Sequence, residues 1–225
     1  MATLKRLILS ISVVLMLSMS AQSADATSLL SLSDGVSNVT LSDNGTGSVT
    51  YAGSVGNFAL NVTTGNTYPI LGTLSAPELE LKSVDLSIRG AGTLSIMYSA
   101  NNFTALAGGI TGLMTELGGA TTGTVDLKLY MDASNTLFGK TTLLADLGPY
   151  STSIFLNAAF SALQPLGPYS LTLVATIINT KDGVNLTTFN AGVAPVPEPG
   201  TVLLVGIGLV GAAFWRTLKQ PSVQA

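Results

Sequence analysis

Apolar and polar residues alternate one for one along several short stretches of this chain. In the stretch GTVDLKLYMD the apolar positions are Val125, Leu127, Leu129 and Met131. The polar positions between them are Asp126, Lys128, Tyr130 and Asp132. Side chains of a β-strand point to opposite faces with a period of two, whereas a helix repeats every 3.6 residues. The stretch therefore predicts a strand with one buried face.

Other stretches repeat or extend this pattern. GTLSIMYS and NFALNVTT are shorter copies. In ELELKSVDLSIR, two leucines alternate with Glu78, Glu80 and Lys82, and the phase then shifts near Ser83. A β-bulge there is expected to keep Val84, Leu86 and Ile88 on the apolar face. Two stretches, 152–160 and 169–180, are apolar on nearly both faces, which predicts central strands covered on two sides.

Turn signals separate these stretches at short intervals. They are Ser33-Asp34-Gly35, Asp43-Asn44-Gly45, Thr64-Gly65-Asn66, Gly118-Gly119, Gly148-Pro149, Gly167-Pro168 and Lys181-Asp182-Gly183. Many short strands, 24 glycines and the lack of a helical period predict an all-β fold, an antiparallel β-sandwich or jelly roll. The segment 101–119 is the least regular, and a short helix is an alternative there.

The N-terminus has the three-part form of a secretory signal peptide. Lys5-Arg6 precede an uncharged apolar run from Leu7 to Met19, and Ala24-Asp25-Ala26 supplies the small residues of a cleavage site. Signal peptidase is therefore expected to cleave after Ala26. Cleavage after Ser23 is the alternative.

A second apolar run, Thr201 to Trp215, lies near the C-terminus and contains no charge. A helix of this length covers about 22 Å, less than the roughly 30 Å hydrocarbon core of a bilayer, so length alone is ambiguous. The flanks favour a transmembrane helix, because Pro197 and Pro199 block its extension backwards and the cations Arg216 and Lys219 can reach the headgroups. A buried core helix is the alternative.

The order of features at this end resembles a known signal. Val196-Pro197-Glu198-Pro199, then an apolar span, then a tail with basic residues, is similar to the PEP-CTERM sorting signal of Gram-negative bacteria. The resemblance implies that exosortase, a membrane protease-transpeptidase, reads Pro197, Glu198 and Pro199 and removes the tail. It also implies an association with exopolysaccharide and biofilm production. The tail departs from the usual tight basic cluster, since its only cations are Arg216 and Lys219.

These signals divide the chain into five parts. They are a signal peptide (1–26), an exported β domain (27–192), a linker with the sorting motif (193–200), a transmembrane helix (201–215) and a short basic cytoplasmic tail (216–225). Basic residues on the outer flank of both apolar segments place both chain ends in the cytoplasm. The precursor is thus expected in the inner membrane, and the processed protein at the cell surface or in the extracellular matrix.

Composition narrows the chemistry of the exported part. The chain has no cysteine and no histidine, so no disulfide is expected and the serines lack the usual partners of a nucleophile. No G-x-S-x-G elbow occurs, although a Ser-Lys pair stays open. Residues 27–199 contain five Lys or Arg and eleven Asp or Glu residues, a net charge of −6, so nucleic acid is not an expected partner. No enzymatic activity is expected.

Several motifs have simpler structural explanations. Gly206, Gly208 and Gly211 have dinucleotide-loop spacing, but only 14 residues follow and none is acidic, so no cofactor is expected. The oxygen-rich turns Asp34-Gly35, Asp43-Asn44-Gly45 and Asp182-Gly183 lack calcium-loop spacing, so no metal is expected. Glu78 and Glu80 are expected to form an exposed charged stripe rather than a catalytic pair. Five N-x-T sequons start at Asn38, Asn44, Asn61, Asn102 and Asn185; solvated strand faces explain them, and surface glycan stays open.

Two functions remain for the exported domain. One is a non-catalytic structural or adhesive β-module at the cell surface, and the other is a carbohydrate-binding or carbohydrate-active domain that acts on the cell's own polysaccharide. Sugar binding usually needs an aromatic platform, and the only tryptophan, Trp215, lies in the tail. Among the tyrosines, Tyr130 is the one most clearly on a polar strand face. This scarcity favours the structural role.

Overall fold

The computed structural model describes residues 26–180, 184–198, 200, 205, 207 and 209. Within this part the chain forms fourteen β-strands. They are β1 (Ser28–Ser33), β2 (Asn38–Ser42), β3 (Ser48–Val55), β4 (Phe58–Asn66), β5 (Gly72–Thr73), β6 (Ala76–Pro77), β7 (Leu79–Arg89), β8 (Gly92–Phe103), β9 (Ile110–Thr121), β10 (Thr124–Asp132), β11 (Thr142–Tyr150), β12 (Phe155–Ala162), β13 (Tyr169–Asn179) and β14 (Val184–Pro197). The segment 1–25, the predicted turn at 181–183 and most of the expected transmembrane helix lie outside the described residues. No helix among the described residues has the length and apolar character needed to cross a membrane.

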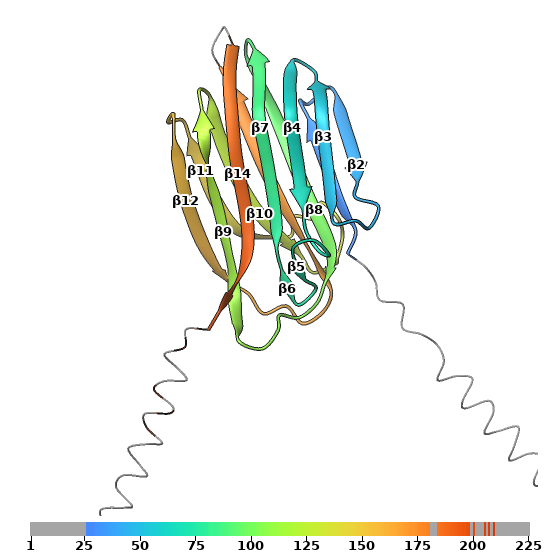
Figure 1. Ribbon diagram of the computed structural model, residues 1–225, viewed down its shortest axis with the longest axis vertical. Helices are drawn as coiled ribbons and strands as arrows, with labels where there is room; N and C mark the ends of the chain where they lie inside the picture. Colours follow the sequence, from blue (N-terminus) through green and yellow to red (C-terminus); the bar gives the residue numbers. More distant parts are fainter. Residues whose placement is uncertain are drawn as a thin grey trace, which may run out of the picture.

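Twelve of the strands build two six-stranded antiparallel sheets that pack face to face (Figure 1). Sheet A has the order β11-β10-β13-β8-β1-β2, and sheet B has the order β12-β9-β14-β7-β4-β3. Strands β7 to β14 have the order of an eight-stranded jelly roll, in which each strand crosses to the other sheet except at the β10–β11 hairpin within sheet A. Strands β1 to β4 widen both sheets at the same side. The predicted all-β sandwich or jelly roll is confirmed.

The core lies between the sheets and follows the predicted alternation. In β10, Val125, Leu127 and Leu129 are fully buried, and the outward Tyr130 is half-buried. The alternation fails at Asp132, which was expected outside and is buried. A register shift against β11 between Leu129 and Tyr130 precedes it. The Asp132 carboxylate instead accepts hydrogen bonds within the following loop, from Ser134 N–H (2.9 Å) and the Thr141 hydroxyl (3.2 Å).

Strand directions place both ends of the domain together. β1 is antiparallel to β8, and β14 is antiparallel to β7, while β7 and β8 are joined by a short turn. As a result β1 begins and β14 ends at the same end of the sandwich, the lower end in Figure 1. The longer connections, such as 67–78 and 133–141, lie at this lower end as well, whereas the opposite end carries short turns.

The two stretches predicted as central strands differ in outcome. β13 is central in sheet A, as predicted, and its inward residues from Tyr169 to Ile177 are buried, but the expected cover on two sides is not found, because Ile178 on the outer face is 37% exposed. β12 is an edge strand of sheet B, so the prediction for 152–160 is wrong. Leu156 is 83% exposed and Phe160 is 49% exposed. Both side chains are apolar, as a central strand would require, but β12 pairs with a strand on one side only and its outer face is not covered by another sheet.

The phase shift predicted in β7 is also corrected. Ser83 faces the core, where its hydroxyl pairs with that of Thr63 (2.9 Å), and Val84 is 44% exposed on the outer face. The simple alternation thus continues through Val84. A register shift does occur here, but only between β7 and β14, and it leaves β7 regular against β4.

Three predicted turns are instead strand residues. Gly65 lies in β4, Gly118-Gly119 lie in β9, and Gly148-Pro149 lie in β11. A Cβ on Gly65 would come within 2.5 Å of the Tyr98 ring, and one on Gly119 within 2.2 Å of Thr188 O. These two glycines serve close packing, not chain reversal. The alternative of a short helix in 101–119 is wrong as well, since β8 and β9 occupy most of this segment.

Candidate functional site

The end of β14 holds the first half of the predicted sorting motif against β9. Val196 is the register partner of Gly112, and Pro197 is the partner of Ile110. The Thr111 hydroxyl donates to Val196 O (3.3 Å), and Glu198 N–H donates to Gly109 O (2.6 Å). The motif therefore starts while the chain is still bonded to the sandwich. The expected linker from 193 is corrected accordingly, because β14 continues to Pro197.

The prolines fit here because one side of β14 is free. β14 pairs with β7 only as far as Val193, opposite Leu79, whereas its pairing with β9 continues to Pro197. Proline has no N–H to donate and is tolerated where a strand lacks a neighbour on one side. Pro195 and Pro197 both lie beyond the last β7 pair. The third motif residue, Pro199, lies outside the described residues.

The predicted cleavage region borders the first strand. Ala24 lies outside the described residues, and Ala26 is 1% exposed. Thr27 N–H donates to Asn101 Oδ1 (3.1 Å), and Asn101 N–H donates to Thr27 O (3.3 Å). The sandwich thus holds the chain from Ala26 onward. Cleavage after Ala26 stays a prediction. It would make Thr27, which is hydrogen-bonded to Asn101, the first residue of the processed protein.

A groove of about 370 Å³ lies on the outer face of sheet B. Its centre is one row across three strands, in which Gly192 of β14 pairs with Glu80 of β7 on one side and with Glu116 of β9 on the other. The two glutamates are separated by two strand spacings, about 10 Å between Cα atoms. Gly118 and Gly192 contribute no side chain to the floor, and Asn190 and Leu156 border it. Among the described residues that line the groove, none is aromatic.

The two glutamates singled out in the sequence, Glu78 and Glu80, both border this groove. Glu80 forms an ion pair with Lys82 (2.5 Å) and accepts a hydrogen bond from the Asn66 amide (3.2 Å), as a charged surface stripe would. The residue that sequence reasoning missed is Glu116, which the β14 pairing brings into the row of Glu80. The signal for it was Gly192, an outward glycine between two strands with outward glutamates.

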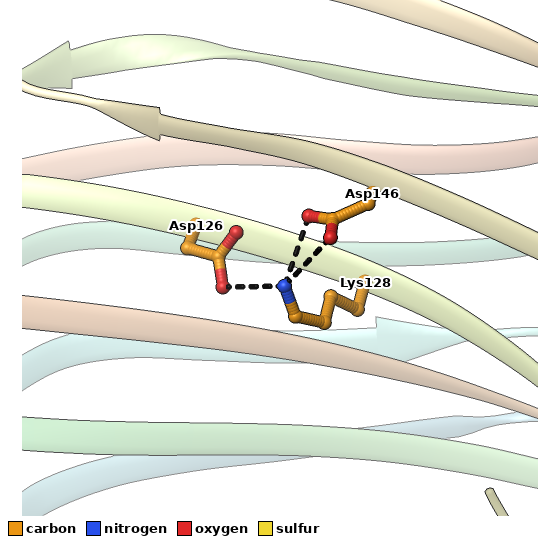
Figure 2. Close-up of polar contacts among 3 residues, drawn as sticks. All are labelled: Asp126, Lys128 and Asp146. Carbon is orange, nitrogen blue, oxygen red and sulfur yellow. Dashed lines mark hydrogen bonds and ion pairs between the residues drawn. The ribbon is translucent and has the colours of Figure 1, made fainter. Parts of the chain in front are cut away.

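A second polar cluster lies on the outer face of sheet A (Figure 2). The Lys128 ammonium contacts both carboxylate oxygens of Asp146 (2.9 Å each) and Oδ2 of Asp126 (3.5 Å). The hydrogen bond from Lys128 to Asp146, with the charge of Asp126, raises the pKa of Lys128. The amine therefore stays protonated at neutral pH, which is the opposite of what a Ser-Lys pair requires of its general base.

The oxygen-rich turns use their carboxylates for the backbone. Asp43 accepts bonds from the N–H groups of Ser28, Gly45 and Gly47 (3.1 to 3.2 Å). Asp34 accepts from Ser37 and Val36 N–H, which lowers its pKa. Asp182 lies outside the described residues. These backbone bonds give both described aspartates a role in turn formation. No group of three or more potential metal ligands occurs in the described part of the chain.

The five sequon asparagines do not share one environment. Asn38, Asn44 and Asn61 are exposed, Asn102 is half-buried and Asn185 is buried. Asn102 is held by Asn135, whose side chain both accepts from its N–H (2.8 Å) and donates to its Oδ1 (2.7 Å). Solvated strand faces therefore explain Asn38 in β2 and Asn61 in β4, whereas Asn44 lies in the turn between β2 and β3.

Comparison with known proteins identifies one part of this chain. Residues 195–219 match the PEP-CTERM protein-sorting motif. The match contains Pro197, Glu198 and Pro199 and confirms the sorting motif predicted from the sequence. No curated protein matches the chain significantly.

Several solved structures match this chain at low scores. They are the C-terminal CBM6 module of LamC from Zobellia galactanivorans (TM-score 0.25, 10% identity, 64% of this chain and 98% of that chain), the K1 cleaved adhesin domain of Lys-gingipain from Porphyromonas gingivalis (0.30, 10%, 68% and 99%) and the enzymatically active domain of tailspike protein 4 of bacteriophage CBA120 (0.33, 8%, 67% and 20%). This chain thus spans a fifth of the tailspike chain. The strand order, and not these likenesses, defines the fold here.

Proposed function

We propose that this chain is an exported surface protein that exosortase processes, and that its sandwich serves the exopolysaccharide matrix as a non-catalytic structural or adhesive module. The observation that carries the proposal is the sorting motif at 195–219, which begins within the last residues of β14, where the strand still pairs with β9. The folded domain and the motif are joined without a free spacer. Exosortase would therefore meet the motif directly at the surface of the domain.

The position of both chain ends supports this arrangement. β1 begins and β14 ends at one end of the sandwich, so a signal peptide and a membrane-anchored tail could both be attached there. The precursor would stand on the outer side of the inner membrane with its long loops toward the bilayer. Signal peptidase would act near Ala26, and exosortase near Glu198.

The polar clusters support a role without catalysis. The protonated Lys128 forms ion pairs with two aspartates, and Glu80 forms one with Lys82. The Asp34 and Asp43 carboxylates accept hydrogen bonds from the backbone of their turns. A general base or nucleophile must be poised for proton transfer rather than bound in a saturated ion pair. These contacts stabilise surface structure and leave each cluster without a free reactive group.

The sorting motif gives the direct test. Replacement of Pro197, Glu198 and Pro199 together by alanine should leave the full-length precursor in the membrane fraction of the native host. The wild type should show a loss of mass equal to the tail. The matched control is Gly206→Ala within the apolar segment, which should be processed normally. Processing of the triple variant at the wild-type rate would refute the assignment to exosortase.

A single conservative change tests how the enzyme reads the motif. Glu198→Gln keeps the shape and removes the charge, so a charge-assisted contact of roughly 1.5 to 3 kcal/mol would be lost. Processing in pulse-chase labelling should then slow by about tenfold or more. An unchanged rate would show that the carboxylate is not recognised by its charge.

The groove on sheet B favours a second candidate, a carbohydrate-binding module. Glu80, Asn190 and Glu116 offer polar atoms for sugar hydroxyls along one trough, but the described lining provides no ring for stacking. Titration of the host exopolysaccharide into the protein, followed by calorimetry, tests this candidate. Binding that disappears in Glu116→Gln and persists in Thr50→Ala, a change at the exposed far edge, would favour it. No heat of binding would favour the structural role.

A further inference from the structure

The four edge strands of the two sheets differ in their protection against pairing with another chain. β2 has only five residues, β3 has a register shift between Tyr51 and Gly53, and β11 has two register shifts against β10. β12 has eight residues, pairs with β9 without a shift and contains neither charge nor proline. A regular, uncharged edge strand is a template for addition of another strand. β12 is thus the open edge of this sandwich.

The hydrogen-bond pattern shows which backbone groups of β12 are free to pair. Leu163 N–H donates to Thr111 O (3.4 Å), one residue beyond the strand, so the odd-numbered residues direct their backbone groups toward β9. In an antiparallel pair these groups alternate, and the even-numbered residues direct theirs to the open side. The Ala158 N–H is consistent with this pattern, because it donates to the Asn157 side chain (2.8 Å) and not to β9.

The side chains of the same even-numbered residues are apolar. Leu156 is 83% exposed and Phe160 is 49% exposed, and Ala158 lies between them. All three belong to the outer face of sheet B, where Ala158 is opposite Glu116 of β9. The open edge therefore combines backbone groups that point away from β9 with a short apolar stripe.

We propose that β12 pairs antiparallel with β12 of a second copy of this chain, around a two-fold axis at Ala158. In this register Ala158 is opposite itself, and Leu156 is opposite Phe160 of the second copy, on both sides of the axis. The even-numbered residues, whose backbone groups point away from β9, form the hydrogen-bonded pairs of this register. Shifting the axis to Asn157 or Ala159 would place Leu156 opposite an alanine instead, so the proposed register pairs the largest apolar side chains.

Charge does not oppose this pairing. β12 contains no charged residue, and the nearest carboxylate in its row is Glu116 on β9. In the pair, the two Glu116 residues are three strand spacings apart, about 14 Å, which exceeds the Debye length of about 8 Å at physiological salt. The bond from Ala158 N–H to Asn157 is replaced by one to the second copy. The Asn157 amide keeps its bond to the Tyr150 hydroxyl (2.5 Å).

The absence of cysteine from the chain makes a sharp test possible. In the proposed register the Ala158 Cα atoms of the two copies are about 5.5 Å apart, within the roughly 4.4 to 6.8 Å that a disulfide requires. The full chain carrying Ala158→Cys, solubilised in mild detergent and oxidised, should give a disulfide dimer that reductant reverses. The matched control is Ala162→Cys on the same strand, whose Cα atoms would be about 27 Å apart and should not crosslink.

A second pair of variants keeps the proposal falsifiable without cysteine. Leu156→Lys replaces an exposed side chain of the stripe, so folding should be retained while the dissociation constant, measured by analytical ultracentrifugation, rises at least about tenfold. Leu143→Lys, on the neighbouring edge strand β11 and 50% exposed, should leave the constant unchanged. Equal crosslinking of both cysteine variants, or a monomer at every concentration, would overturn the proposal. Association that Leu156→Lys does not weaken would also overturn it.

Discussion

The contact between Gly65 and Tyr98 joins the two sheets and can be tested by adding one methyl group. Gly65 lies in β4 on the inner side of sheet B, and Tyr98 lies in β8 of sheet A and is fully buried. A Cβ on Gly65 would lie 2.5 Å from Cδ2 and Cε2 of the Tyr98 ring. The backbone of Gly65 does not have a positive φ, so alanine meets only this steric obstacle.

The expected cost of Gly65→Ala follows from this distance. Ordinary carbon contacts are about 3.5 Å or longer, so the ring must move by about 1 Å. The ring is enclosed, and its hydroxyl donates to the Ser28 hydroxyl (3.1 Å), so the movement disturbs the core. Overpacking of this kind costs about 1 to 3 kcal/mol, and we expect the upper half of that range. For a domain of this size the melting temperature should fall by about 5 to 10 °C.

A double-mutant cycle isolates the contact. Unfolding of residues 27–198 in urea, followed by circular dichroism, gives the free energy of unfolding of each variant. In the Tyr98→Leu background, the cost of Gly65→Ala should fall by about 2 kcal/mol, because the obstructing ring is gone. Gly192→Ala is the control, since no atom lies within 4 Å of its added Cβ. Equal costs for the two glycines, or an unchanged cost in the Tyr98→Leu background, would refute the packing argument.

Three further predictions concern the domain as a whole. Residues 27–198 alone should be soluble, give a β-type circular dichroism spectrum and unfold cooperatively with no effect of reductant; a shorter fragment ending at 192 should be less stable, because it loses the last β9 pairs. Ser134 N–H lowers the pKa of Asp132 below its ordinary value of 3.8, so this contribution to stability is present above about pH 4 and is lost as the pH falls through the lower folded-state pKa. Acid titration of Asp132→Asn should accordingly show a smaller loss of stability than the wild type, and an identical loss would contradict the assignment. A reporter that is active only in the periplasm should be active when fused after Gly200 and silent after Ala225, and activity at both points would show that the C-terminal segment does not stop in the membrane.

The sequence predicted the elements that depend on local pattern. The alternation in β10 and the apolar run in β13 identified both strands, because the buried face of a strand determines how apolar residues are spaced along the sequence. The sorting motif was equally readable, since it depends on consecutive residues. These predictions required no knowledge of which strands are neighbours.

Three of the errors and omissions depend on neighbours that are distant in sequence. The apolar residues of β12 resemble those of a central strand, and only the strand order places it at an edge. Gly65 was assigned to a turn, whereas Tyr98, 33 positions later, is what requires it to lack a side chain. Glu116 became a groove residue only through its pairing with Gly192. Long-range pairing decided each case, and no local period encodes it.

The proposed β12 pairing and the membrane anchor constrain each other through strand direction. Antiparallel pairing about a two-fold axis turns the second copy end for end, so its sorting motif lies at the opposite end of the assembly. Two precursors anchored in one membrane point the same way and could not pair in this manner. The pairing therefore fits copies that exosortase has released, or copies carried by two facing surfaces. With Ala158→Cys, oxidation should crosslink detergent-solubilised protein and leave the protein in intact inner-membrane vesicles monomeric, and equal crosslinking in both preparations would show that the copies meet in another orientation.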